Sequence, residues 1–352
     1  MKSELLFVQT LLISSILIAL VGYGCNSNDQ NAEIETNPEN PDDSISFGYE
    51  DIAGIGYAKD VSRRDPSDII QAGDDYYIWY TRIPATTGGQ KTRLYNSGYY
   101  GTIWYATSSD GYTWIEKGKA LGPGEKGAFD SHAVFTPNIL KYEDKYYLYY
   151  TGVKPTPGNP DNEFQNNAET DVTAIGLAVS YTPDGPFERI ATEPILKISE
   201  DAAQFDSYRI DDASVVVKDK AVWLYYKGRS RIHGPSGPRK TRMGVAFADK
   251  PQGPYVKYVN PLVDKSHEVL IWNHAGGVAS LASIDRSINM APDGLNFSII
   301  QENLVQIPTA PGLYRPHLTD HSIKEMPGWG ISHKVKDGDI YLVRFKMQSN
   351  LE

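Results

Sequence analysis

The sequence predicts an all-β protein, more narrowly a five-bladed β-propeller. An aromatic strand after a tight acidic turn occurs at residues 74–82, returns at 144–152 and returns again, more loosely, at 219–228. Recurrence at a fixed period, here about 70 residues, is the signature of an array of similar units. The composition agrees, because 24 Tyr favour half-buried pleated surfaces while 31 Gly and 22 Pro supply turns. A pair of β-sandwiches is the competing fold, but sandwiches do not usually repeat one strand order five times.

Each unit contains three recognisable parts in the same order. A short polar triplet leads into an apolar strand, the aromatic strand follows, and a strand of small residues then runs into a turn that closes a hairpin. The small-residue strand and its turn occupy 103–111, 175–180 and 243–248, while 291–297 ends a fourth unit and 337–344 belongs to a fifth. Five units of about 60 residues provide four strands each, as the blades of a propeller require.

The first 46 residues differ in composition from the rest. Residues 1–25 combine a short charged start, an apolar stretch and small residues before Cys25, which predicts a lipoprotein signal peptide with lipidation at Cys25. An ordinary signal peptide and an N-terminal membrane anchor are the alternatives. Residues 26–46 carry almost no apolar side chain, which predicts a disordered acidic tether before a catalytic propeller at 47–352. We therefore expect a bacterial cell-envelope protein, lipid-anchored or periplasmic, that meets the membrane only through its lipid.

Charge and cysteine content exclude several classes of function. The net charge of −10 argues against a nucleic-acid partner, because such partners are held through their phosphates. Cys25 is the single cysteine, so the mature chain would have no other thiol for disulfides, zinc–thiolate sites or a cysteine nucleophile. An acidic chain remains compatible with a neutral sugar ligand.

The repeat places candidate site residues around one mouth of the central funnel. The polar triplets begin at Asp65, Thr136 and Asp212. The corresponding entries in the fourth and fifth units are His267-Glu268 and Arg315-Pro316-His317. The strand pattern around these positions repeats while the residue at the start of the strand changes. This is typical of a functional site built on a repeated scaffold. Substrate contacts are expected from Thr136, His132, Arg209, Arg315 and His317.

Carboxylates on different blades suit glycoside hydrolysis, which needs an acid for the leaving oxygen and a base or nucleophile on the other face of the sugar. A separation of about 6.5–9.5 Å leaves room for a water and gives inversion. Asp65 and Asp212 are suited to this chemistry. Arg63 and Arg64 precede Asp65, and a nearby cation keeps a carboxylate ionised, as a base requires.

Several motifs in order resemble glycoside hydrolase family 117. They are residues 64–68, 102–111, 135–140, 209–213, 225–229 and 267–269, and the resemblance covers about residues 60–345. The family implies an exo-acting, inverting enzyme that removes 3,6-anhydro-α-L-galactose from the non-reducing end of neoagaro-oligosaccharides by cutting an α-1,3 bond. The implied substrate is an oligosaccharide from a marine red-algal polysaccharide, which places the protein in agar degradation and polysaccharide utilisation.

The resemblance also implies roles for individual residues. Asp65 matches the general base, and either Asp211 or Asp212 matches the second essential carboxylate, of which the internal repeat favours Asp212. His267 matches the general acid, a reasonable choice because the unperturbed pKa of histidine lies near operating pH. Glu268 follows directly and either acts as the acid itself or holds the imidazole ring.

No cofactor is implied and no metal is expected to be essential, although related propellers hold a divalent cation in the central channel. The family implies a homodimer built with an N-terminal helical segment, and residues 52–58 depart from that pattern. Two other functions stay open. One is an α-L-arabinofuranosidase or β-xylosidase-like hydrolase of the related propeller families 43 and 62, with a Glu acid in place of His267. The other is a non-catalytic glycan-binding propeller. The substituents of the glycan do not follow from the sequence.

Overall fold

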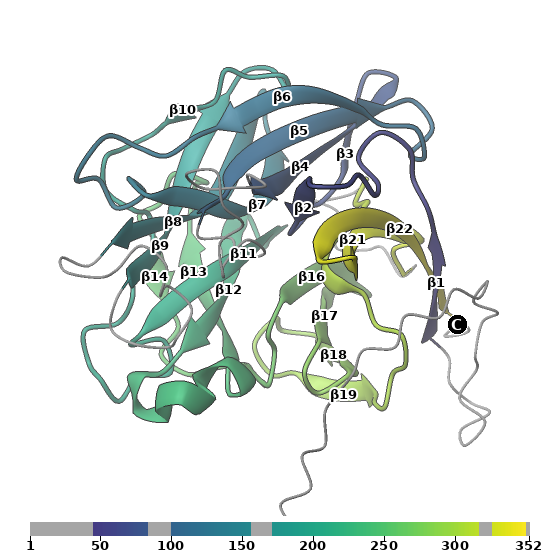
Figure 1. The fold of residues 1–352 in the computed structure, drawn as a ribbon. Helices are drawn as coiled ribbons and strands as arrows, with labels where there is room; N and C mark the ends of the chain where they lie inside the picture. The colour runs from purple at the N-terminus through teal and green to yellow at the C-terminus, as the bar shows by residue number, and fades with distance from the viewer. Residues whose placement is uncertain (1–44, 84–99, 156–170, 317–325, 350–352) are drawn as a thin grey trace, which may run out of the picture. The chain divides into compact units, whose positions relative to one another are not determined.

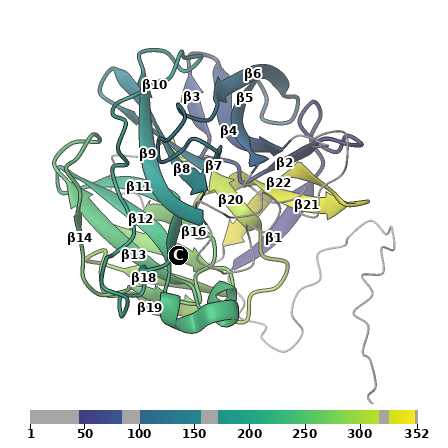
Figure 2. The same ribbon diagram turned by 60° about the vertical axis from the view of Figure 1, so that its left-hand side comes forward.

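A computed structural model describes residues 45–83, 100–155, 171–316 and 326–349. Within these residues the strands form five antiparallel sheets, arranged as the blades of a five-bladed β-propeller (Figures 1 and 2). The predicted fold class is confirmed. Residues 1–44, with the predicted leader, Cys25 and nearly all of the predicted tether, lie outside the described residues. No helix in the described ranges is long and apolar enough to cross a membrane.

The blades follow one another along the chain. Blade 1 consists of β2 (Ser62–Arg64), β3 (Ile70–Ala72), β4 (Asp75–Ile83), β5 (Thr102–Ser108) and β6 (Ile115–Leu121). Blade 2 consists of β7 (Ala133–Tyr142), β8 (Lys145–Pro155), β9 (Asp171–Ser180) and β10 (Glu188–Arg189). Blade 3 consists of β11 (Arg209–Lys218), β12 (Ala221–Arg229), β13 (Arg242–Ala248), β14 (Val256–Lys257) and β15 (Val263–Asp264), with the 3-10 helix η2 (Arg231–Arg239) between β12 and β13.

Blade 4 consists of β16 (Val269–His274), β17 (Gly277–Ala282), β18 (Ser287–Ala291) and β19 (Ser298–Gln301). Blade 5 consists of β20 (Thr309–Leu313), β21 (Trp329–Lys336), β22 (Asp339–Ser349) and β1 (Ile45–Glu50). The last strand of blade 5 is therefore the first strand of the described chain. It pairs with β22 from Ile45 opposite Ser349 to Glu50 opposite Arg344, which closes the ring.

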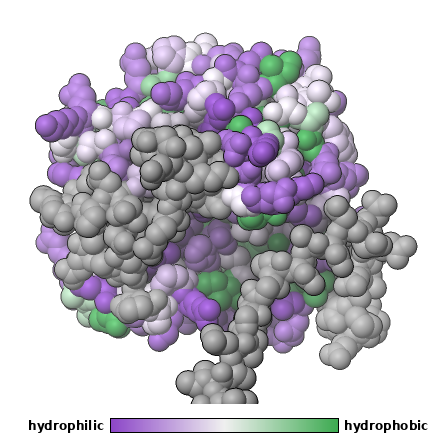
Figure 3. Space-filling view, in the orientation of Figure 1, coloured by the Kyte–Doolittle hydropathy of each residue, from purple (hydrophilic) through white to green (hydrophobic). Residues whose placement is uncertain are grey.

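The recurring aromatic strands are β4, β8 and β12, the strands that follow the inner strand in blades 1 to 3. Their rings fill the spaces between neighbouring blades. Trp79 belongs to the cluster that joins blades 1 to 3, Tyr225 to the cluster of blades 3 and 4, and Tyr80 to the cluster of blades 5 and 1. Burial of one large apolar side chain contributes roughly 1.5–3 kcal/mol. On the face seen in Figure 3, hydrophilic side chains predominate and apolar patches are small.

A buried ion pair at the centre of the ring connects all five blades. The Arg315 guanidinium, after β20, pairs with the Asp68 carboxylate of blade 1. It also donates to the Val215 carbonyl of blade 3 at 2.9 Å and the Ile271 carbonyl of blade 4 at 3.1 Å. Asp68 in turn accepts from Asn138 Nδ2 of blade 2 at 2.9 Å. The sequence placed Arg315 among the substrate-binding rim residues; in the structure its guanidinium has these three partners, and substrate binding by Arg315 stays a prediction.

The segment at 52–58 contains no helix. Ala53 forms a bridge with Thr113, and Gly54 turns with φ +82° so close to Trp114 that an added Cβ would lie 1.8 Å from its carbonyl oxygen. The segment thus packs against its own propeller. The homodimer stays a prediction.

Candidate active site

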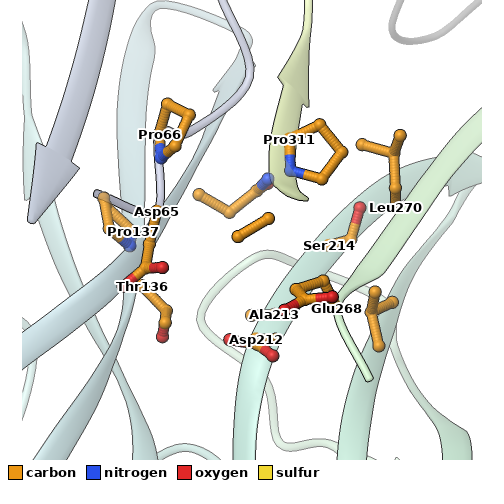
Figure 4. Close-up of a pocket in the computed structure, with 13 residues that line it drawn as sticks. Asp65, Pro66, Thr136, Pro137, Asp212, Ala213, Ser214, Glu268, Leu270 and Pro311 are labelled. Atoms are coloured by element: carbon orange, nitrogen blue, oxygen red, sulfur yellow. The ribbon is translucent and has the colours of Figure 1, made fainter. Parts of the chain in front are cut away.

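A pocket lies where inner segments of the five blades meet. It has about 370 Å³ of space, part of it open to solvent. Blade 1 contributes Asp65, blade 2 Thr136, blade 3 Asp212, and Glu268 lies just before blade 4. Figure 4 shows Asp65 and Thr136 on one side of the pocket, with Asp212 and Glu268 across from them. The structure therefore brings four of the sequence-predicted site residues around one cavity.

The same backbone conformation, a residue with positive φ, recurs at three of these residues. Asp65, Thr136 and Asp212 have φ of 49°, 44° and 54°, in the left-handed region that residues with a Cβ seldom adopt. In β7 and β11 the pairing register shifts at this point, between Phe135 and Asn138 and between Asp211 and Ser214. Such a bulge re-aims a side chain at a functional site. The bulge is the reason that the polar triplets recur in the sequence.

The fifth copy of this backbone conformation lies at other residues than the sequence predicted. Ala310 has φ of 40° and lines the pocket together with Pro311, and the register of β20 shifts between Thr309 and Gly312. A Cβ on Gly312 would lie 1.8 Å from the Ser67 carbonyl oxygen, so blades 1 and 5 need a glycine there. The fifth rim entry is thus Ala310-Pro311-Gly312 and does not begin at Arg315. His317 lies outside the described residues.

Asp65 is buried between a cation and a neutral imidazole. Arg64 Nε donates to Asp65 Oδ2 at 2.8 Å, and His333 Nδ1 on β21 lies 3.9 Å from Asp65 Oδ1. Burial, together with the positive charge of Arg64, lowers the pKa of His333 to about 4. Asp65 thus has a charged hydrogen-bond donor on one carboxylate oxygen and the imidazole near the other.

Asp212 shares a buried lysine with its neighbour. Lys227 Nζ, on β12, lies 2.6 Å from Asp212 Oδ2 and 3.1 Å from Asp211 Oδ1. Burial and the charge of Asp211 raise the pKa of Asp212, Lys227 and His267 lower it, and the net result is a pKa of about 7. The two acids raise the pKa of Lys227 although its burial works the other way. The buried cluster thus combines a permanent ammonium with a carboxyl that exchanges its proton near neutral pH.

His267 and Glu268 form a hydrogen-bonded pair at 2.7 Å between Nδ1 and Oε1. Ser283 Oγ donates to the other carboxylate oxygen of Glu268 at 2.7 Å. Burial opposes ionisation of Glu268, but the hydrogen bond and charge of His267 and the bond from Ser283 lower its pKa below the ordinary value. When His267 is protonated, its Nδ1–H donates to the ionised Glu268, and its Nε2–H is the second donor of the ring, the one that can give a proton to a substrate.

Other predicted contact residues lie away from the pocket lining. His132 precedes β7 and its ring packs edge-on against Tyr100. Arg209 is almost fully buried at the start of β11, with its guanidinium over the Tyr208 ring. The sequence did not point to His333, and it gave Lys227 only as part of the motif at residues 225–229. The register of β12 against β11, which sets Lys227 opposite Asp211, was the missing information.

No group of three or more His, Cys, Asp or Glu side chains in the described part of the chain is arranged to hold a metal ion. The expectation that no metal is essential stays a prediction.

Comparisons with known proteins agree with this geometry. Residues 60–237, just over half of the chain, match the family model described as Glycosyl hydrolases family 43. The structure of Zg3597, a family 117 glycoside hydrolase produced by the marine bacterium Zobellia galactanivorans, is similar with a TM-score of 0.74 and 27% identity, covering 87% of this chain and 92% of that one. No curated protein matches the chain.

Two further solved structures share the fold. One is an endo-arabinase from Bacteroides thetaiotaomicron, with a TM-score of 0.52 and 13% identity, covering 86% of this chain and 98% of that one. The other is the GH43_1 enzyme from Xanthomonas citri complexed with xylotriose, with a TM-score of 0.52 and 15% identity, covering 84% and 90%. Families 43 and 117 are related five-bladed propellers. The chain belongs to glycosyl hydrolases family 43 by its family model, it is a glycoside hydrolase, and the resemblance to family 117 that its motifs predicted is confirmed.

Proposed function

We propose that the protein is an exo-acting, inverting hydrolase that releases 3,6-anhydro-L-galactose from the non-reducing end of neoagaro-oligosaccharides by cleaving α-1,3 bonds. The motif resemblance to family 117 and the similarity to Zg3597 support this choice of substrate. The observation that carries the proposal is the pocket in which Asp65, Asp212 and Glu268 converge from three parts of the ring, with His267 bonded to Glu268.

In the proposed reaction one water molecule replaces the leaving alcohol at the anomeric carbon. Asp65 takes a proton from the water as its oxygen attacks one face of the sugar. His267 gives a proton to the glycosidic oxygen as the bond to the anomeric carbon breaks. The attack from the face opposite the leaving group inverts the configuration. Asp65 then releases its proton to solvent, and His267 takes up a proton from solvent.

Asp212 tunes this pair in the proposed mechanism. Its carboxyl lies close enough to His267 for the charge of His267 to lower the pKa of Asp212. The Lys227 ammonium keeps Asp212 in place beside the sugar. We further propose that the enzyme works at the bacterial cell envelope without an essential metal.

Product analysis tests the proposal. The purified protein is incubated with neoagarobiose and neoagarotetraose, and the first-formed anomer is followed by proton NMR. Release of 3,6-anhydro-L-galactose with an inverted anomeric centre is the expected result. Failure to hydrolyse either sugar, with the protein folded, would reject the agar-type substrate, and a retained configuration would reject the inverting mechanism.

A family 43-type hydrolase acting on arabinofuranosides or xylosides is the second candidate. The presence of Glu268 in the pocket lining and the family match favour it. The lowered pKa of Glu268 argues against that carboxyl as the proton donor. Aryl α-L-arabinofuranoside and β-xyloside in the same assay separate the two candidates.

A further inference from the structure

Arg229 is a buried cation whose side chain lacks a counterion within the described residues. It ends β12, is 9% exposed, and its Nε–H has no hydrogen-bond partner among those residues. Leaving a buried charge uncompensated is costly, so buried charges are paired in most proteins. A cation of this kind is ready to receive an anion from outside the chain.

The position of Arg229 connects it with the active site. Side chains on one face of a strand recur at every second residue, so Arg229 shares a face of β12 with Lys227, whose ammonium contacts Asp212. Trp223 and Tyr225, on the same face, belong to the apolar cluster between blades 3 and 4. Arg229 therefore lies on the face of β12 that is turned toward blade 4, close enough for its charge to act on Lys227. At about 3.3 Å per residue, it lies roughly 7 Å from Lys227 along the strand.

The surrounding sequence is strongly basic in an acidic protein. Residues 227–242 contain six Lys and Arg and no Asp or Glu, whereas the chain as a whole has a net charge of −10. Arg239 and Lys240, after the β12 end, are exposed. A concentration of one sign of charge near a cleft attracts ligands of the opposite sign.

We propose that Arg229 is the centre of a subsite for an anionic substituent of the glycan, a sulfate ester or a uronic carboxylate, on a sugar unit next to the scissile bond. The proposal rests on the function proposed above, since it takes the pocket to be the glycosidase active site. A guanidinium offers two parallel N–H donors that match the oxygens of either group. The enzyme therefore prefers charged oligosaccharides over neutral ones of the same backbone.

The test measures binding separately from turnover. Asp65→Asn is made in the full chain, and calorimetric titration follows a neutral neoagaro-oligosaccharide, a sulfated galactan oligosaccharide of equal length and an oligosaccharide with a terminal uronate. The same titrations are repeated with Arg229→Gln, with Arg229→Lys, and with Arg242→Gln as the matched control. Arg242 lies on the same blade, where it pairs at the surface with Asp264.

We expect one of the charged ligands to bind at least roughly 10-fold more tightly than the neutral one, as a charge-assisted contact allows. Arg229→Gln abolishes this preference and leaves the neutral ligand unchanged, Arg229→Lys keeps part of it, and Arg242→Gln keeps all of it. Equal binding of neutral and charged ligands, or an equal loss of both in Arg229→Gln, overturns the proposal. The ligand that shows the preference identifies sulfate or carboxylate as the group recognised.

Thermal unfolding with inorganic sulfate supplies a second readout. Because Arg229 has no internal counterion among the described residues, Arg229→Gln is expected to keep or raise the Tm. Sulfate is expected to stabilise the wild type more than this variant. A marked fall in Tm would show a structural partner and overturn the proposal. Selective binding without hydrolysis of any substrate would sink the proposed function but leave the anion subsite in place.

Discussion

The Lys227 ammonium lies between two carboxylates, 2.6 Å from Asp212 Oδ2 and 3.1 Å from Asp211 Oδ1. All three side chains are nearly excluded from solvent. Asp212 lines the catalytic pocket, whereas Lys227 stands behind it on the neighbouring strand. Lys227 is therefore a positioning residue, and its charge lowers the pKa of Asp212 against the effect of burial.

Lys227→Met tests this relationship. The ammonium favours the ionised form of Asp212, so its removal should raise the pKa of Asp212 above about 7 by a further ~1 unit or more. The limb of the kcat/KM profile that reports Asp212 should move to higher pH, and the fold should lose about 3–5 kcal/mol because two acids lose their partner. Lys220→Met, at an exposed turn, is the control. An unchanged pH profile would contradict the role given to Lys227.

Asp65→Asn should lower kcat/KM by roughly 10²–10⁴-fold, the range typical of a general base. Substrate affinity should change little, because the amide keeps the shape of the side chain. Steady-state kinetics with the identified substrate, together with calorimetric titration, measures both quantities. Full hydrolysis by Asp65→Asn would remove Asp65 from the mechanism.

His267→Gln and Glu268→Gln separate the two candidate acids. With His267 as the proton donor, His267→Gln should lose most activity toward substrates with poor leaving groups and retain more with an activated aryl leaving group. Glu268→Gln should show a smaller loss, since it weakens the 2.7 Å bond that orients the ring. If His267→Gln is harmless and Glu268→Gln is inactive, the acid is Glu268.

His333 should make the fold sensitive to mild acid. Its pKa is about 4 in the folded protein and 6.5 for an ordinary histidine, so the unfolded chain binds the proton more readily between these values. The contribution of His333 to the free energy of unfolding is thus fully present above about pH 6.5. It falls by up to ~3 kcal/mol as the pH drops to about 4. His333→Gln should flatten that part of the curve. Urea unfolding at pH 7.5, 5.5 and 4.5 compares the two proteins, and parallel curves would contradict this expectation.

Arg315→Met should destabilise the propeller by about 3–5 kcal/mol, because Asp68 would remain as a buried charge without its partner. Arg315→Met combined with Asp68→Asn should recover much of the loss. Tm values of the two single variants and the double variant form the measurement. Additive losses would argue against a direct coupling of the two side chains.

The sequence was sufficient for the ring and for much of the pocket. The aromatic repeat predicted the blades. The triplets at Asp65, Thr136 and Asp212 marked the β-bulges, because the same backbone conformation in each blade requires a similar short sequence. The fifth triplet was misplaced at Arg315, because Ala310 and Gly312 have no polar side chain by which the sequence pattern could be recognised. His333 and Lys227 reach the site from second strands of the blades. Their neighbours depend on strand register, which a repeat alone does not reveal.

The pairing of β1 with β22 has a consequence for biosynthesis. Glu50 and its partner Lys346 are 296 positions apart, so the earliest strand of the ring must wait for the last one to leave the ribosome. Until then the apolar residues Ile45 and Phe47 are part of an unpaired edge, and edges of this kind readily pair with other nascent chains. Until the ring is complete, β22 of a second copy can take the place of the chain's own β22, so ring closure is a step open to strand exchange.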